Sequence, residues 1–276
     1  MDFKNSQFKI IYKPGGRAQE YAESSKGADD GLAANLYKGC RHNCAFCYVP
    51  TLPTWKFVPG NPRVAFHEKV LARGDVLAGL ESDARKLAGQ FQGRPIDNPL
   101  HLCFTCDPYP ITDNEDFVDV TRDALLTFER FGFSNVQVLT KGGERAVRDF
   151  DILSRNGWKF GQTIVFRSPD AYARYEPGAA GFDSRLAALR FAKDAGLKTW
   201  VSIEPVIDPV EALLVIDEIK PYVDIWKIGK LNHGKEISPA LAEIEASVDW
   251  RQFAGLAKQQ LIGREVLFKD SLAKYL

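Results

Sequence analysis

The sequence predicts an α/β protein whose parallel sheet forms a partial (β/α)6 barrel of the TIM type. Apolar, β-rich runs alternate with amphipathic segments of helix length, and the alternation gives six strand–helix units. Strands that alternate with helices are joined by right-handed crossovers and form a parallel sheet. Polar or reactive side chains also stand where the strands end, as in parallel barrels. Six units are too few for the usual eight-stranded barrel, so we expect it to stay open on one side.

The elements follow one another in a regular order. The first strand is expected over 31–37 (GLAANLY), and it leads into a loop rich in cysteine. Apolar residues recur at helical spacing in the segments between strands, for example at 186, 189 and 192. This spacing predicts helices over about 75–90, 115–131, 143–156, 183–196 and 209–220. The other strands are expected over 100–105, 136–140, 160–166, 198–205 and 223–229.

Length and composition favour a single domain. The chain has 276 residues, 45% of them hydrophobic, which suffices for one large core. We expect one domain over 1–276, with an N-terminal extension (1–30), a barrel core (31–230) and a short C-terminal extension of helices (231–276). Lys+Arg and Asp+Glu balance at 36 each, so the net charge leaves the partner open.

The chain shows no sign of a membrane or an export signal. No apolar run reaches the roughly 18 residues of a membrane span, and the N-terminal MDFKNSQFKIIYKPGG has no signal-peptide pattern. We therefore expect a cytoplasmic protein without a membrane partner. A reducing compartment also keeps its cysteines available as ligands.

The most specific motif is CxxxCxxC, formed by Cys40, Cys44 and Cys47. Three thiolates this close together can bind three irons of a [4Fe–4S] cluster and leave the fourth iron open to a non-protein ligand. A second pair, Cys103 and Cys106, leaves an alternative: a zinc site made of this pair with Cys44 and Cys47.

The motif, with Phe46 directly before its last cysteine, resembles the signature of the radical S-adenosylmethionine (SAM) superfamily. The resemblance implies that the cysteines hold the cluster and that the open iron binds SAM. It also implies reductive cleavage of SAM to a 5′-deoxyadenosyl radical, which abstracts a hydrogen from the substrate. Phe46 would flank the adenine and Tyr48 would lie close to SAM. An external one-electron reductant, flavodoxin-like or ferredoxin-like, is the implied partner.

Within that superfamily, roughly residues 30–210 resemble spore photoproduct lyase and its DNA-repair-photolyase-like relatives. The segments that carry the likeness are TCDPYP, VQVLTKGGERAVRDFDIL and YEPGAAGFDSRLAALRFAKDAGLKTWVSIEP. The hydrogen-returning cysteine of that lyase falls at Phe104 here, so this chain is expected to differ from it. Positions 104 and 106 share one face of a strand, so Cys106 could take over that role.

Three further candidates stand at expected strand ends. Lys141, which follows VQVLT, matches the lysine of the family's TK segment, and the resemblance implies that it binds the SAM carboxylate, although a solvated lysine is the alternative. Asp107 could hydrogen-bond a ribose or the substrate, or simply open a turn. Glu204 is expected to point into the barrel mouth, with a salt bridge as its alternative. Lys227 and Lys230 could meet an anion, and His42 could tune the cluster through a hydrogen bond.

Three functions stay open. The first is a radical SAM enzyme acting on DNA or a nucleotide, in repair or modification, as the family resemblance implies. The second is the same chemistry on a peptide or small metabolite. The third is a non-catalytic iron–sulfur or zinc-stabilised binding module.

Overall fold

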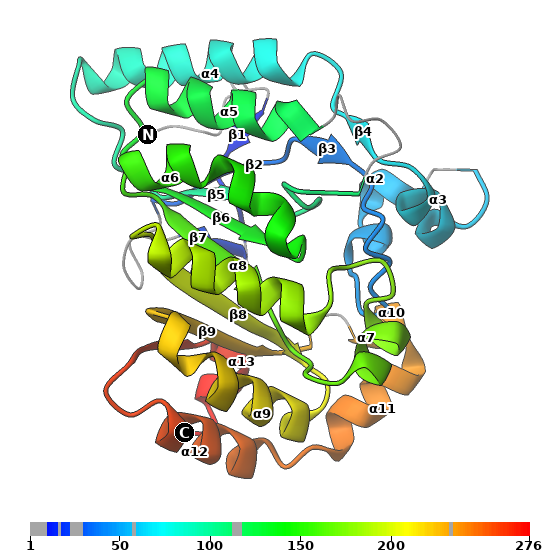
Figure 1. Ribbon diagram of the computed structural model, residues 1–276. Helices are drawn as coiled ribbons and strands as arrows, with labels where there is room; N and C mark the ends of the chain where they lie inside the picture. Colours follow the sequence, from blue (N-terminus) through cyan, green and yellow to red (C-terminus); the bar gives the residue numbers. More distant parts are fainter. Residues whose placement is uncertain (1–9, 16–17, 23–29, 57–58, 112–117, 232–233) are drawn as a thin grey trace.

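An open, curved sheet forms the centre of the protein (Figure 1). The computed structural model describes residues 10–15, 18–22, 30–56, 59–111, 118–231 and 234–276. In this sheet β2 and β5 to β10 pair in parallel with their neighbours, and β1 pairs antiparallel with β2. The order in the sheet is β1 (Ile11–Tyr12), β2 (Leu32–Ala34), β5 (Leu100–Leu102), β6 (Val136–Thr140), β7 (Lys159–Thr163), β8 (Lys198–Val206), β9 (Ile225–Lys230) and β10 (Glu265–Phe268). The predicted fold class is confirmed.

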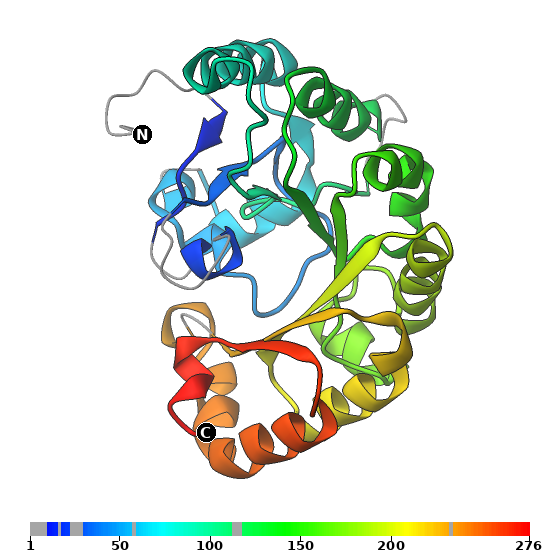
Figure 2. The ribbon, with the colours of Figure 1, turned by 90° about the vertical axis from the view of Figure 1, so that its left-hand side faces the viewer.

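Helices cover the outer face of the sheet. Figure 2 shows the sheet curving inside this layer of helices. The layer consists of α4 (Val76–Phe91), α5 (Val118–Arg130), α6 (Phe150–Arg155), α8 (Phe182–Asp194), α9 (Pro209–Ile219) and α12 (Trp250–Gln260). The other described helices are α1 (Gln19–Ala22), α2 (Pro53–Lys56), α3 (Pro62–Glu68), α7 (Pro169–Tyr175), α10 (Gly234–Ile237), α11 (Pro239–Ser247) and α13 (Asp270–Ala273). None of the described helices is both long and apolar enough to span a membrane.

The sheet has one more strand at each edge than the sequence predicts. β1 and β10 have two and four residues, too few for a periodic pattern to show. β10 lies in the C-terminal extension that was expected to be helical, and it pairs in parallel with β9. The predicted division at residues 30 and 230 stays a prediction.

Asn35 explains why two predicted strands are shorter than expected. Its side-chain oxygen accepts the backbone N–H groups of Phe104 (2.8 Å) and Thr105 (2.9 Å), so neither N–H is available to a neighbouring strand. β2 therefore ends at Ala34 and β5 at Leu102. The last residue of the predicted first strand, Tyr37, belongs to β3 (Tyr37–Lys38), which pairs with β4 (Leu71–Ala72). The inference that positions 104 and 106 share a strand face is wrong, because the strand has already ended.

Two predicted helices also differ at their starts. Residues 143–155 form a 3₁₀ helix, η4 (Gly143–Asp149), followed by α6, and Gly143 at the start of η4 has a positive φ of 58°. Two further 3₁₀ turns are η2 (Val49–Thr51) and η5 (Lys220–Tyr222). The described part of α5 begins at Val118, and positions 115–117 of the prediction lie outside the described residues.

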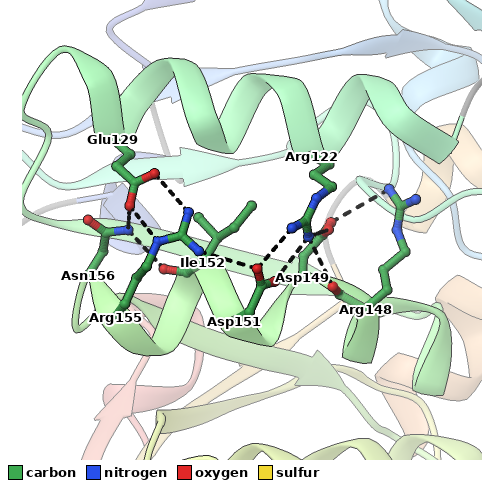
Figure 3. Close-up of polar contacts among 8 residues, drawn as sticks. All are labelled: Arg122, Glu129, Arg148, Asp149, Asp151, Ile152, Arg155 and Asn156. Carbon is green, nitrogen blue, oxygen red and sulfur yellow. Dashed lines mark hydrogen bonds and ion pairs between the residues drawn. The ribbon is translucent and has the colours of Figure 1, made fainter.

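An ion-pair network joins α5 to α6 on the outside of the barrel (Figure 3). Arg122 contacts the fully buried Asp149 at 3.0 Å and the half-exposed Asp151 at 2.8 Å. Arg155 makes a two-pronged contact with Glu129, at 2.7 and 2.8 Å. The bidentate geometry fixes the two helices against each other.

Inside the barrel, one glycine makes room for a large ring. A Cβ at Gly161 would lie 2.4 Å from the indole of Trp200, which is 1% exposed. The Trp200 ring N–H donates to the carbonyl of Val138 at 3.1 Å. The Trp200 ring therefore fills the space beside Gly161 inside the barrel.

Candidate active site

One cavity of about 850 Å³ lies at the C-terminal ends of the strands. Its walls come from the loop after β3, the ends of β5, β6 and β8, helices α10 and α11, and the segment after β10. All nine residues predicted to form the site line this cavity: Cys40, Cys44, Phe46, Cys47, Tyr48, Cys106, Asp107, Lys141 and Glu204. The structure thus brings together residues from four separate segments of the sequence.

Two glycines allow the cysteine loop to lie close to its neighbours. A Cβ at Gly39 would lie 1.9 Å from the carbonyl oxygen of Lys69, and Gly39 has a φ of 82°. A Cβ at Gly178 would lie 2.0 Å from the carbonyl oxygen of Arg41, inside the loop. The Gly178 N–H donates to His42 O at 3.0 Å. The segment after α7 therefore packs directly on the backbone of the cysteine loop.

Helix α3 holds the other side of the loop. The guanidinium of Arg63 donates to the carbonyls of Cys44 (3.0 Å) and Cys47 (2.9 Å). The Nδ1 atom of His67 contacts the carbonyl of Cys40 at 2.7 Å. The cysteine backbone is thereby fixed by groups that leave the sulfurs to the cavity.

The three motif cysteines line one cavity, and a cluster places different demands on them than a single metal ion does. Among the described residues, no three His, Cys, Asp or Glu side chains gather closely enough to hold one ion, which leaves the alternative zinc site unsupported. A zinc ion at about 2.3 Å from each sulfur needs tightly grouped ligands. In a cube each cysteine binds a different iron, so wider spacing fits. Burial raises the pKa of Cys40, Cys44 and Cys47, so these thiols need bound cations to ionise.

Asp107 joins two strand ends and the cysteine loop. Its carboxylate accepts from the Thr140 hydroxyl (2.6 Å) and from the backbone N–H groups of Tyr109 and Lys141 (2.8 Å each). Burial opposes ionisation, but His42 and these donors together lower the pKa of Asp107. Asp107 is therefore an anion already bonded to protein groups, and contact with SAM or substrate stays a prediction for it.

In the described structure, the ring nitrogens of His42 contact Asp107 and Arg145. Its Nδ1 is 3.5 Å from Asp107 Oδ2, and Arg145 donates to its Nε2 at 3.1 Å. Burial lowers the pKa of His42 to about 4, so the ring is neutral and carries its proton on Nδ1. His42 therefore links Asp107 to Arg145, and its predicted hydrogen bond beside the cluster sulfurs stays a prediction.

Lys141 lies between the cysteine loop and a buried ion pair. Its ammonium is 3.8 Å from Glu176 and 5.5 Å from the ring centre of Phe46. Burial alone would lower the pKa of Lys141, but Cys44 and Glu176 raise it overall, so Lys141 stays charged. Glu176 also pairs with the fully buried Arg185 at 2.7 Å. The two cations outnumber the single carboxylate, which suits an anionic ligand.

Tyr48, Phe104 and Cys106 all line the cavity. The Tyr48 hydroxyl donates to the Phe104 carbonyl at 3.1 Å. The Cys106 sulfur accepts the backbone N–H of Tyr37 at 3.4 Å and is partly accessible. Burial, and then contact with Cys106, raises the pKa of Cys103. Cys106 is thus the more accessible thiol of this pair.

Glu204 has a partner that sequence reasoning missed. Tyr21, in α1, donates its hydroxyl to Glu204 and lies 2.8 Å from the Ser202 hydroxyl. Lys269, just after β10, is 3.2 Å from Glu204. Tyr21 belongs to the expected N-terminal extension, and no motif links it to residues about 180 positions away in sequence. Glu204 therefore lines the cavity, as predicted, and it also forms a salt bridge, which was the alternative.

Lys227 and Lys230 both bond to protein groups. Lys227 donates to the Tyr21 carbonyl at 2.8 Å, and Lys230 pairs with Glu245 of α11 at 2.6 Å. Neither lysine is among the residues that line the cavity. Their suggested contact with an anionic ligand therefore has no support in this arrangement.

Comparison with known proteins gives likenesses of fold. No family model and no curated protein sequence matches this chain. A spore photoproduct lyase complexed with dinucleoside spore photoproduct matches with a TM-score of 0.63 at 16% identity, over 96% of this chain and 80% of that chain. A lyase mutant with bound AdoMet and the dinucleoside gives a TM-score of 0.58 at 17% identity, over 88% and 64%.

A peptide-related protein shows the same architecture. Streptococcus suis SuiB bound to S-adenosylmethionine matches with a TM-score of 0.54 at 10% identity, over 86% of this chain and 49% of SuiB. In a further lyase mutant the match covers 83% of this chain and 64% of that one, so this chain spans less than two thirds of its length. Together these likenesses show that the chain shares its fold with spore photoproduct lyase and SuiB.

Proposed function

We propose that this protein is a radical SAM enzyme in which Cys40, Cys44 and Cys47 hold a [4Fe–4S] cluster with one iron open to SAM. The observation that carries the proposal is the meeting of these cysteines with Lys141 and Glu204 on one cavity, in a chain with this fold. When bound, the cluster supplies an electron that cleaves SAM to methionine and a 5′-deoxyadenosyl radical.

The residues around the cysteines bind and orient SAM. Lys141 offers a charged donor to the SAM carboxylate, and Glu176 holds its ammonium in place from 3.8 Å. Phe46 and Tyr48 present aromatic faces for the adenine. Asp107 keeps the strand ends and the Lys141 backbone in register, and a ribose contact is its further proposed role.

Cys106 and Glu204 are the proposed catalytic residues. Cys106 is a partly accessible thiol in the cavity, so it can return a hydrogen atom to a product radical in place of the cysteine expected at position 104. Glu204, held by Tyr21 and Lys269, is a fixed carboxylate that can accept a hydrogen bond from the substrate. Both roles need the substrate to lie between the two side chains.

DNA or a nucleotide is the proposed substrate class. The lyase whose structure matches over 96% of this chain is complexed with a dinucleoside photoproduct. A peptide is the second candidate, because SuiB bound to a precursor peptide also matches, with a TM-score of 0.50. A flavodoxin-like or ferredoxin-like reductant in the cytoplasm and a single catalytic domain complete the proposal.

Isotope transfer tests the substrate class. The anaerobically reconstituted protein is incubated with SAM, dithionite and either perdeuterated DNA or a perdeuterated peptide pool. We expect deuterium in 5′-deoxyadenosine only with the DNA. Deuterium transfer from the peptides alone would favour the second candidate, and a fully iron-loaded protein that forms no 5′-deoxyadenosine would contradict both.

A further inference from the structure

A second polar cluster lines the cavity besides the cysteine loop and Lys141. It consists of His101 on β5, Ser202 and Glu204 on β8, Tyr21 on α1 and Lys269 after β10, and we call it the Ser202 cluster. None of its members belongs to the proposed cluster or SAM contacts, so it is available to bind the substrate.

The hydrogen bonds in the Ser202 cluster have a fixed direction. A carboxylate only accepts, so the Tyr21 proton goes to Glu204. The Tyr21 oxygen, 2.8 Å from Ser202 Oγ, must therefore accept the Ser202 proton. Ser202 then presents its oxygen to a ligand as an acceptor.

His101 has a buried ring nitrogen that makes no hydrogen bond to the described residues. The residue is 1% exposed, and its Nδ1 has no partner among the described residues. Burial, with Lys227 and Lys269 nearby, lowers the pKa of His101, so the ring is neutral and can place its proton on Nδ1. A buried ring nitrogen without a partner is unfavourable, and a ligand that bonds it removes that cost.

An aromatic platform lies directly on His101. The Phe104 ring is centred 4.3 Å from the His101 ring and 6.3 Å from the Tyr21 ring. Phe104 is half-buried and lines the cavity, so a shift of this one side chain gives a ligand access to His101. Aromatic faces of this kind bind planar rings by stacking.

Charges within the Ser202 cluster balance one another. Lys269 lies 3.2 Å from Glu204, so the one cation and the one carboxylate of the cluster form an ion pair. An anionic group would meet Glu204, and a cationic group would meet Lys269. The cluster therefore suits a neutral group that carries both a hydrogen-bond donor and an acceptor.

We infer that the Ser202 cluster binds the lactam or imide edge of a substrate ring, with His101 donating to a ring carbonyl and Ser202 accepting the adjacent ring N–H. This inference rests on the proposed function and narrows its substrate to a nucleobase of the uracil, thymine or guanine type. A ring amide is cis, so its N–H and C=O lie side by side on one edge. A peptide bond is trans, so its N–H and C=O point to opposite sides.

Methylated nucleosides test this inference without turnover. Equilibrium dialysis of the reconstituted full chain with SAM measures the dissociation constants of uridine, 3-methyluridine, guanosine and 1-methylguanosine. In each methyl derivative the edge N–H is lost while the ring face is kept. We expect the unmethylated nucleosides to bind about tenfold more tightly. Equal affinities, no nucleoside binding, or binding only of a peptide amide would overturn the inference.

Amino-acid substitutions test which side chains recognise the edge of the ring. Ser202→Ala should bring the methylation ratio close to one, because it removes the acceptor of the edge N–H. His101→Phe should weaken the binding of both nucleosides of each pair, because it removes the donor to the ring carbonyl. Ser154→Ala, on the outer helix α6, should leave the ratio and the affinities unchanged. If Ser202→Ala keeps the full ratio, or His101→Phe leaves both affinities unchanged, the edge is not recognised here. Uncoupled 5′-deoxyadenosine formation, measured on the same samples, shows separately whether the proposed function stands.

Discussion

The loop that carries the cysteines depends on two positions where a side chain would not fit. At Gly178 a Cβ would lie 2.0 Å from the Arg41 carbonyl, and at Gly39 one would lie 1.9 Å from the Lys69 carbonyl. Both contacts are with backbone, which cannot rotate away. The spacing of Cys40, Cys44 and Cys47 is therefore set partly by residues outside the motif.

Gly178→Ala should reduce cluster binding. The added methyl group pushes the segment after α7 away from the cysteine loop, with a cost of about 1–3 kcal/mol in the free energy of unfolding. We expect less iron per chain after reconstitution, measured by absorbance and iron assay. Gly181→Ala is the matched control, because a Cβ there meets nothing within 4 Å. Equal iron loading of the two variants would contradict this role.

Lys227 should make stability depend on pH. Burial, Lys159 and Lys269 lower the pKa of Lys227 from 10.5 to about 7. Between these values the unfolded chain binds more protons than the folded one, so the contribution of Lys227 to stability rises with pH. The free energy of unfolding, relative to Lys227→Met, should rise by at most about 1.4 kcal/mol per pH unit. Urea denaturation at pH 6.5, 7.5 and 8.5 measures it, and a constant difference would refute the assignment.

Among the elements, α5 and α6 are joined by ion pairs of two different kinds (Figure 3). Arg122 reaches Asp149, which is fully buried, whereas Arg155 and Glu129 are 45% and 30% exposed. Buried charges are costly to leave without a partner, and exposed pairs contribute little. The two arginines should therefore differ in importance although their geometry is similar.

Arg122→Met should destabilise the fold more than Arg155→Met. Removal of Arg122 takes away the close partner of Asp149, with a cost of about 1–3 kcal/mol. Removal of Arg155 should cost at most about 1 kcal/mol, since its pairs are exposed to solvent. Thermal and urea denaturation of both variants at low and moderate salt give the comparison. A larger loss from Arg155→Met would show that the network works differently.

Parts of the fold could be predicted from the sequence because their signals are local. The parallel strands β2 and β5 to β9 and the long helices show periodic apolar patterns, and CxxxCxxC is a short motif. The ends of β2 and β5 could not be predicted, since Asn35 captures two N–H groups about 70 residues away. β10 is too short for a pattern to show.

For the whole molecule, the candidate site could be predicted only where it follows strand ends. The parallel barrel gathers such residues on one cavity, so the nine candidates meet there. Tyr21 and Lys269 reach Glu204 from segments at the two ends of the chain. No periodic sequence pattern links these segments. They meet at Glu204 only because the folded chain brings both of them to the ends of the strands. The part of the site around Glu204 was therefore less predictable than the cysteine motif.

The most direct test of the central claim is 5′-deoxyadenosine formation from SAM by the anaerobically reconstituted protein under dithionite. We predict product from the native chain, and none above background from Cys40→Ala, Cys44→Ala or Cys47→Ala. Cys103→Ala, which changes a buried cysteine outside the motif, should retain iron and SAM cleavage. Full SAM cleavage by any of the three motif variants, or none by an iron-loaded native chain, would contradict the account.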